Sequence, residues 1–269
     1  MSTKRVIFCT YSSIYSSKVL EPLIADDTVE VVAIINSTRV FDKKHGFIGG
    51  AITQIKISGL RYAAYLFIVT DLFRWFQPLF KLKKWPLKSV HGLANQHEIP
   101  LLDTSDINNE ESLQFIRKHE PNYLLAAHFN QLVKAPLLEQ AGLECLNIHP
   151  SILPAYKGVD PVFFAMLDRK KEMGVTLHKM TETFDSGEIL LQESVLLGSV
   201  RSLCFYNCRL FEEGVKLALN WMNNKRETSI EVGDNTFGQY DSWPKTEQIK
   251  RFRRSGNRLV SISELWKAQ

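Results

Sequence analysis

Short runs of β-branched and aliphatic residues alternate along this chain with stretches of helical periodicity. The first two runs, Arg5–Cys9 and Val29–Ile35, flank a Ser-rich loop and an apolar-periodic stretch around Val19–Ile24. Runs this short and continuous are typical of strands buried on both faces of a parallel sheet. The alternation therefore predicts a β-α-β unit within an open, mostly parallel, twisted α/β sheet, whose ligands collect at the carboxyl ends of its strands.

Later segments continue the alternation and indicate how the chain is divided. We expect residues 1–200 to form the catalytic domain, with a helical insertion at about 42–88, and residues 201–269 to form a C-terminal helix and short extension packed on it. Helices are expected over Ser89–His97, Asn108–His119, Pro136–Ala141, Pro161–Leu167, Leu203–Trp221 and Lys245–Arg254, and strands over Asn122–Ala127, Glu144–Ile148, Gly174–Met180 and Glu188–Val195.

Composition and residue spacing argue against several classes of function. The net charge is only +4, from 33 basic and 29 acidic residues, whereas nucleic-acid-binding domains carry a concentrated basic stripe.

The four cysteines lack paired CxxC spacing and are interpreted as reduced core thiols. Since no signal-peptide pattern follows Met1, a cytoplasmic location is expected. The seven histidines have no metal-ligand spacing, so no metal is expected.

The segment Gly59–Phe80 departs from the alternation, because it is apolar and long enough to cross a bilayer. Arg61, Asp71 and Arg74 interrupt it, which argues against a membrane span. We favour an insertion that packs on the core or forms a homodimer. A helix lying on an anionic membrane surface, a peripheral contact through residues 59–80, stays open as the alternative. The basic residues that favour this alternative are Arg61, Arg74, Lys81, Lys83, Lys84 and Lys88.

The loop after the first strand, Thr10–Ser17, contains four serines and no glycine. Dinucleotide-binding folds place G-x-G-x-x-G here so that the backbone can approach a pyrophosphate, so binding of NAD or FAD in that manner is not expected. The serines can cap the following helix or donate hydroxyls to another anion. Both interpretations of this loop stay open.

Two loops further on combine residue types that suit acyl transfer without a covalent intermediate. Asn147 and His149 are two residues apart at the end of a predicted strand, so their side chains share one face at its carboxyl edge. Asp185 precedes a Ser-Gly turn just before another apolar strand. An amide can donate to an oxyanion, an imidazole can donate or accept a proton, and a carboxylate can orient that imidazole. No G-x-S-x-G, Walker A or H-E-x-x-H motif competes with them.

At these residues the sequence resembles the 10-formyltetrahydrofolate-dependent formyltransferase family, and its layout is most similar to the sugar N-formyltransferases. The family's N-x-H, S-L-L-P-x-x-x-G, G-V-T and D-x-G motifs are matched in the same order and spacing. The β-α pattern up to about residue 200 is consistent with the family's Rossmann-like core. The matching stretches are Asn147–His149, Ser151–Gly158, Gly174–Thr176 and Asp185–Gly187.

The resemblance implies that Asn147, His149 and Asp185 are the family's catalytic set and that 10-formyltetrahydrofolate is the formyl donor. It also implies a donor pocket between the loop at 129–132 and the loop before Asp185. The acceptor is then a primary amine on a small biosynthetic molecule, with an amino sugar, nucleotide-linked or not, as the favoured class. The donor-pocket candidates are Phe129, Asn130, Gln131, Leu132 and Phe184, and the acceptor-side candidates are Ser12, Ser13, Tyr156 and Lys157.

Other functions stay open beside amino-sugar formylation. Methionyl-tRNA formyltransferases carry a C-terminal barrel, for which too few residues follow Lys225 here. Formyltetrahydrofolate hydrolases add an N-terminal regulatory domain, whereas this chain begins at its first strand. A non-catalytic or membrane-associated module with the same fold is the remaining alternative. The chain also departs from the family pattern at Met173, at Lys157 where many members have Arg, and in the insertion Arg39–Trp85.

Overall fold

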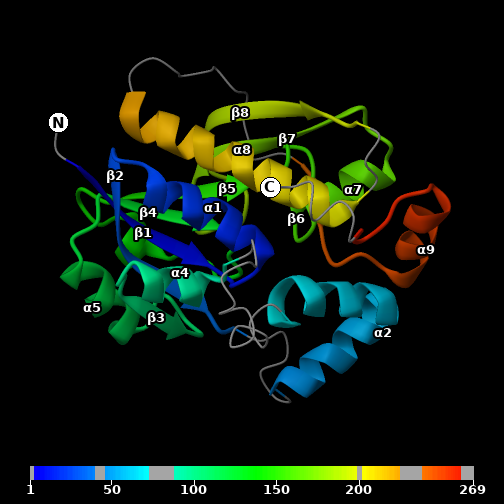
Figure 1. Cartoon of the computed structure of the whole chain (residues 1–269), viewed down its shortest axis with the longest axis horizontal. Helices are drawn as coiled ribbons and strands as arrows, with labels where there is room; N and C mark the ends of the chain where they lie inside the picture. The colour runs from blue at the N-terminus through cyan, green and yellow to red at the C-terminus, as the bar shows by residue number, and fades with distance from the viewer. Residues whose placement is uncertain (1–2, 40–45, 73–87, 199–201, 225–237, 262–269) are drawn as a thin grey trace.

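Parallel strands on one side and an antiparallel pair on the other make the central sheet of this computed structural model. The structure describes residues 3–39, 46–72, 88–198, 202–224 and 238–261 (Figure 1). Within them a seven-stranded sheet has the order β3-β2-β1-β4-β5-β7-β8, parallel from β3 to β5 and antiparallel from β5 to β8. The strands are β1 Lys4–Thr10, β2 Val29–Ser37, β3 Leu101–Thr104, β4 Tyr123–Ala127, β5 Glu144–His149, β7 Glu172–Lys179 and β8 Ile189–Leu196.

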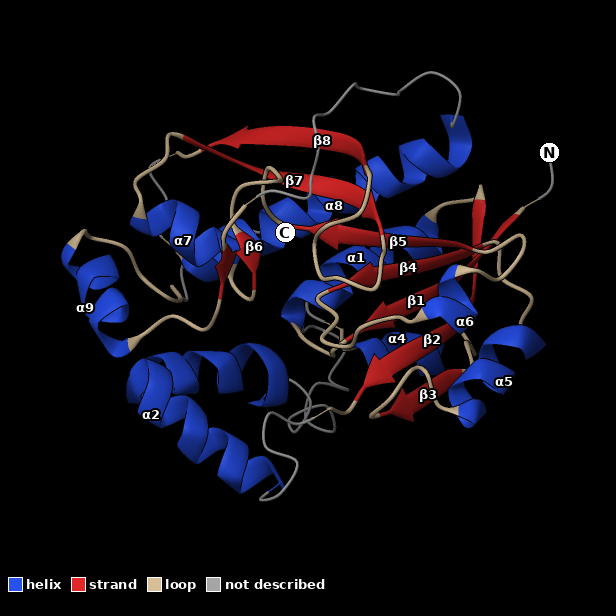
Figure 2. Cartoon of the chain, turned by 180° about the vertical axis from the view of Figure 1, so that it is seen from behind, coloured by secondary structure: helices blue, strands red, loops and turns tan. Residues whose placement is uncertain are grey.

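Side chains of alternate residues of β1 enter two separate hydrophobic clusters, one on each face of the sheet. Val6 and Phe8 belong to the cluster that includes the α1 and α8 side chains, and Ile7 and Cys9 belong to the cluster under α5. Because both faces are covered, the strand is apolar throughout, which confirms the predicted doubly covered sheet. Figure 2 shows α5 and α6 on the side of the sheet away from α8.

Helices pack on both faces of the sheet, and their ends follow local capping. Ser13 caps α1 by accepting a hydrogen bond from Ser16 N, and Asn109 caps α5 in the same way from Ser112 N. Acidic residues begin α5 and basic residues end it, as the helix dipole favours. The helices on the sheet are α1 Ile14–Ala25, α4 Val90–Gln96, α5 Glu110–Lys118, α6 Ala135–Leu138, α7 Pro161–Leu167 and α8 Leu203–Asn224.

The sequence did not reveal the edge strand β3. Its four residues, Leu101–Thr104, are short and only partly buried, so they lack the continuous apolar run that marks the central strands. Its pairing with β2 decides the strand, since Ile34 to Ser37 align with Leu101 to Thr104. The predicted strand Gly174–Met180 begins earlier in the structure, at Glu172.

The C-terminal extension joins the core through a second, small sheet. Strand β6, Lys157–Gly158, pairs in parallel with β9, Tyr240–Asp241, and the helix α9, Thr246–Arg254, follows. Tyr240 and Asp241 thus pair with β6 rather than with the central sheet. The four cysteines are buried and free.

The insertion forms a helix, α2, from Gly46 to Phe67, followed by a π-helical turn from Ile68 to Leu72. Residues 73–87 lie outside the described part of the chain, and with them the expected basic flanks Arg74, Lys81, Lys83 and Lys84. Tyr62, Tyr65 and Val69 are buried against the core, in agreement with the favoured core-packing interpretation. Among the described helices, none has the length and apolar character needed to cross a bilayer.

A glycine allows α8 to lie close against the sheet. A Cβ at Gly214 would lie 2.3 Å from Ile148 Cγ2 and 2.9 Å from Val175 Cγ2, both on buried strands. We expect Gly214→Ala to lower the free energy of unfolding, because overpacking costs about 1–3 kcal/mol and the gain in helix propensity is about 1 kcal/mol at most. Urea unfolding measures this. Gly198→Ala is the control, since its nearest contact would be 4.0 Å away; equal stability of both variants would contradict the prediction.

Candidate active site

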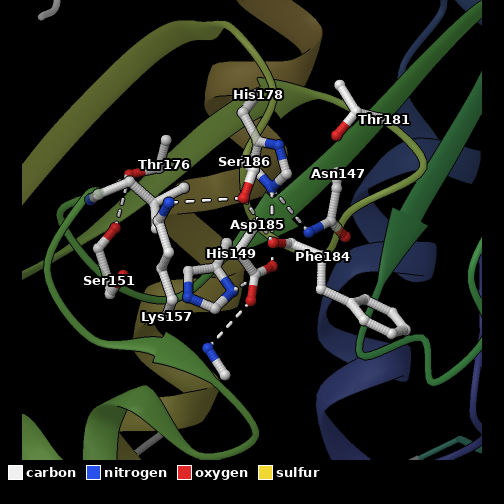
Figure 3. Close-up of polar contacts among 12 residues, drawn as sticks. Asn147, His149, Ser151, Lys157, Thr176, His178, Thr181, Phe184, Asp185 and Ser186 are labelled. Atoms are coloured by element: carbon white, nitrogen blue, oxygen red, sulfur yellow. Dashed lines mark hydrogen bonds and ion pairs between the residues drawn. The ribbon is translucent and has the colours of Figure 1, made fainter. Parts of the chain in front are cut away.

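Asn147 and His149 lie at the carboxyl end of β5, where the sequence places them, and Figure 3 shows both side chains on one face of that strand. His149 is buried and Asn147 is half-buried. The antiparallel neighbour β7 places His178 directly opposite Asn147 and Thr176 opposite His149. Polar side chains from β5 and β7 therefore lie together at the carboxyl end of β5.

His178 orients the amide of Asn147. Asn147 Nδ2 lies 3.0 Å from His178 Nε2, and His178 Nδ1 lies 2.8 Å from the carbonyl oxygen of Lys179. Since a carbonyl can only accept, Nδ1 carries the proton and Nε2 accepts from the amide. Burial lowers the pKa of His178 to about 4, with a further decrease from the neighbouring His149. A neutral His178 therefore fixes which way the Asn147 amide points.

Asp185 lies in the loop between β7 and β8 and joins this loop to the end of β5. Its Oδ1 is 3.3 Å from His149 Nδ1, and its Oδ2 accepts a hydrogen bond of 3.0 Å from the Gly158 backbone N–H. His149 Nε2 donates to the carbonyl oxygen of Tyr156 at 3.1 Å. Both nitrogens of the His149 ring thus face acceptors, and the ring is held between the two loops (Figure 3).

At two glycines a neighbouring backbone carbonyl lies so close that no side chain would fit. A Cβ at Gly158, whose φ is +116°, would lie 2.0 Å from the carbonyl oxygen of Asp241, and one at Gly187 would lie 1.8 Å from that of Lys179. Asp185 itself has a φ of +54°, a left-handed conformation that Asp tolerates better than most residues. These constraints explain the glycines that follow Lys157 and Ser186.

The loop from Ser151 to Gly158 is fixed through Thr176. The Thr176 hydroxyl donates to the carbonyl oxygen of Ser151 at 2.6 Å and accepts from Leu153 N at 3.1 Å. Gln192 of β8 adds hydrogen bonds of 2.9 Å to the Thr176 hydroxyl and to the Leu153 carbonyl oxygen. Hydrogen bonds from β7 and β8 therefore hold the loop that contacts His149 and Asp185.

An amide donor, an imidazole and a carboxylate in contact can perform a defined set of steps. The Asn147 amide can donate to an oxyanion that forms on a carbonyl carbon, and the imidazole of His149 can take up or release a proton. The Asp185 carboxylate stabilises the imidazolium and can accept a proton from a nucleophile. The arrangement therefore suits nucleophilic addition to a carbonyl followed by expulsion of a leaving group.

The residues expected on the donor side lie in two loops that touch each other. The Ala135 backbone N–H donates to Glu182 Oε1 at 3.0 Å, which joins the segment after residue 132 to the loop before Asp185. Phe184 is 41% exposed beside the carboxylate, and its ring points away from His149 (Figure 3). Asn130 is exposed and Phe129 and Leu132 are half-buried.

Two side chains of this loop are already bonded within the fold. Asn130 accepts from the Ser37 hydroxyl at 2.5 Å and donates to the carbonyl oxygen of Arg39 at 3.2 Å. Gln131 is buried and makes three such bonds. The amide nitrogen donates to the Ser37 hydroxyl at 2.7 Å and to the Thr104 carbonyl oxygen at 2.9 Å, and its oxygen accepts from Ile107 N at 2.6 Å. Gln131 therefore ties β2, β3 and the loop after β4 together, so that it positions this loop.

The four acceptor-side candidates are in two places. Ser12 and Ser13 follow β1 and are buried; Ser13 Oγ caps α1 and lies 3.1 Å from His128 Nδ1. Tyr156 is half-buried, and its hydroxyl donates to Asp168 at 3.2 Å. Lys157 is only 4% exposed, and its Nζ lies 3.5 Å from Ser186 Oγ, beside the Asp185 loop. Their role toward an acceptor stays a prediction.

Sequence reasoning missed two residues of this site. His178 is two positions after Thr176 on the same strand, so the two side chains share a face of that strand. Because Thr176 belongs to the matched G-V-T motif, this spacing could have indicated His178 as a site residue. Tyr240 is brought beside Lys157 by the pairing of β6 with β9. Burial and the negative charge of Asp185 raise the pKa of Tyr240. Nothing in the sequence alone links positions 157 and 240.

The described residues contain no group of three or more His, Cys, Asp or Glu side chains that could hold a metal ion. The chemistry above uses only hydrogen bonds and proton transfer among the side chains of the site.

The family model described as Formyl transferase matches residues 50–217, a span that includes Asn147, His149, His178 and Asp185. This chain belongs to the formyl transferase family. A methionyl-tRNA formyltransferase of Thermotoga maritima is 29% identical over 171 residues, which cover 63% of this chain and 54% of that relative. The chain thus spans about half the length of this curated relative.

Solved structures of formyltransferases share the fold. A sugar N-formyltransferase from Shewanella sp. has a TM-score of 0.54 at 16% identity, covering 89% of this chain and 76% of its own. WlaRD, a sugar 3N-formyltransferase solved in the presence of dTDP and 5-N-formyl-THF, has a TM-score of 0.54 at 17% identity, covering 98% and 84%. At these identities the likeness concerns the formyltransferase fold.

In this formyltransferase fold the buried His178 makes stability depend on pH. Because its pKa is lowered to about 4 in the folded state, an unfolded chain with an ordinary histidine binds the proton first as the pH falls. The wild type should therefore lose stability relative to His178→Gln between about pH 6.5 and pH 4, by at most about 1.4 kcal/mol per pH unit. Urea unfolding of both proteins across this range measures the difference, and a difference independent of pH would contradict a neutral buried His178.

Proposed function

We propose that this chain transfers the formyl group of 10-formyltetrahydrofolate to a primary amine of a small biosynthetic acceptor. The observation that carries the proposal is the contact of 3.3 Å between His149 Nδ1 and Asp185 Oδ1, with Asn147 on the same face of β5. Membership of the formyl transferase family supports the assignment, because the family model spans all three residues.

In the proposed reaction the neutral amine attacks the formyl carbon, and a new C–N bond forms as the carbonyl oxygen becomes an oxyanion. Asn147 donates to this oxyanion, and His149, whose imidazolium form Asp185 stabilises, takes up and releases a proton. The amine's proton passes through these groups to N10 of the folate, and the bond between N10 and the formyl carbon breaks. Tetrahydrofolate and an N-formyl amine are the products.

The donor is proposed to bind between the loops at 129–132 and 181–185. Phe184 offers an exposed aromatic face next to Asp185, which suits a flat heterocycle. Asn130 is exposed, but its amide is bonded to the Ser37 hydroxyl and to the Arg39 carbonyl oxygen, and the bonds of Gln131 to β2 and β3 also keep this loop in place. Of the five candidates, Phe184 is thus the best placed to contact the donor directly.

An amino sugar, nucleotide-linked or not, is the acceptor class that we propose. Its support is the likeness in fold to two sugar N-formyltransferases, one of them solved with dTDP. The second candidate is methionyl-tRNA, which the name of the Thermotoga maritima relative favours. The net charge of +4 argues for the small molecule. A homodimer, a cytoplasmic location and a membrane contact through residues 59–80 stay predictions.

Substitution of any of the three catalytic candidates should lower kcat strongly and leave the fold intact. We expect Asn147→Ala to lower kcat about 10²–10³-fold through loss of an oxyanion donor, and His149→Ala and Asp185→Asn about 10²–10⁴-fold through loss of proton transfer. Release of tetrahydrofolate from 10-formyltetrahydrofolate in the presence of an amine measures this. His97→Ala, at an exposed histidine, is the control. Unchanged turnover in His149→Ala would refute the assignment.

The acceptor is tested in four reactions with 10-formyltetrahydrofolate. Three of them contain free amino sugars, amino sugars linked to UDP or dTDP, or methionyl-tRNA, and the fourth contains no amine. We expect tetrahydrofolate release to depend on an amino sugar and the sugar to gain one formyl group by mass spectrometry. Release that depends only on methionyl-tRNA would replace the proposed acceptor. Release without any amine would indicate a hydrolase and contradict the transfer.

A further inference from the structure

The helix α2 is divided by Gly59 into two halves that are held against the core at different points. Gly59 has φ +80° and ψ 162°, so the chain turns between the halves. Beside the turn, the Thr246 hydroxyl of α9 donates to the carbonyl oxygen of Ile57 at 3.3 Å. Tyr62, in the second half, donates to Asp160 Oδ2 at 2.6 Å. Figures 1 and 2 both show α2 at the periphery, below α9 and away from the strands β1, β4 and β5.

The first half of α2 has polar side chains inside and apolar side chains outside. Gln54 and Ser58 are buried and hydrogen-bonded to each other at 2.9 Å. On the outer face Ile48, Ile52 and Ile55 are 73%, 48% and 39% exposed at helical spacing. An ordinary surface helix has the opposite arrangement. Packing against the described part of the chain therefore does not explain the exposed isoleucines.

The second half of α2, beyond the turn at Gly59, has exposed apolar side chains of its own. Leu60 is 68% exposed and Phe67 is 38% exposed, while Tyr62 and Tyr65 on the opposite side of the helix are buried. We call Ile48, Ile52, Ile55, Leu60 and Phe67 together the outer face of α2. Exposed apolar side chains gathered on one segment are typical of interaction sites.

Basic residues lie among these apolar side chains. Lys56 and Arg61 are exposed on α2, and the sequence from Lys43 to Thr70 contains four basic residues and no acidic one. Asp42 and Asp71 flank this stretch, so that residues 42–71 carry a net charge of +2. A basic, apolar surface is attracted to anionic lipid, whereas two copies of it would repel each other.

We propose that the outer face of α2 docks on an anionic membrane surface. The isoleucines, Leu60 and Phe67 enter the boundary between headgroups and acyl chains, and Lys56 and Arg61 contact the lipid phosphates. Tyr62, Tyr65 and the α9 contact keep the helix attached to the core, so that the whole protein is brought to the surface. This inference does not depend on the formyl acceptor.

The test is flotation of the full-length protein with two kinds of vesicle, one of phosphatidylcholine alone and one containing phosphatidylglycerol. We expect binding to the anionic vesicles only, weakened by high salt because exposed charges are screened. Ile52→Glu and Lys56→Glu should each lower the fraction bound at least about tenfold, since each replaces an anchor by a repelled charge.

Leu196→Glu is the matched control, because Leu196 at the end of β8 is 73% exposed, as Ile48 is. It should bind anionic vesicles like the wild type, and all three variants should keep the wild-type circular dichroism spectrum. Absence of binding to anionic vesicles, equal binding to phosphatidylcholine, or equal loss in Leu196→Glu would overturn the proposal. A change of oligomeric state in Ile52→Glu, measured by light scattering, would assign the face to a second copy and also overturn it.

Discussion

The contacts of the Asp185 carboxylate hold the site together. One oxygen faces His149 at the end of β5 and the other accepts from the Gly158 backbone, so one side chain joins the loop after β7 to the loop after β5. Residue 158 has no Cβ, which lets the backbone of Asp241 in β9 pack against it. The small sheet β6–β9 and the site therefore depend on each other.

Strand β7 runs antiparallel to β5, and this pairing provides a contact that a fully parallel sheet would not provide. It places His178 opposite Asn147 at the carboxyl end of β5, and burial keeps that histidine neutral. A neutral ring that donates to Lys179 leaves a nitrogen free to accept from the Asn147 amide. The orientation of a reactive amide is thus set by strand register together with desolvation.

The insertion is joined to the same region through a buried carboxylate. Asp160 caps α7 two residues after Gly158 and accepts from Tyr62 of α2, and burial raises its pKa to about 6. The inner side of the second half of α2, with Tyr62 and Tyr65, therefore packs on the core. The membrane contact that we propose concerns only the opposite, outer side of the helix.

The sequence by itself determined the doubly covered sheet and the pair Asn147 and His149, because strand periodicity and a two-residue spacing are local properties. The motif order also identified Asp185 as their partner. The edge strand β3, the pairing of His178 with Asn147 and the position of Tyr240 beside Lys157 were decided only by the tertiary structure. Each depends on register between segments far apart in the chain, and the face of α2 that is exposed depends on which side the core covers. Such pairings arise from packing free energy summed over many contacts, which no local pattern of residues encodes.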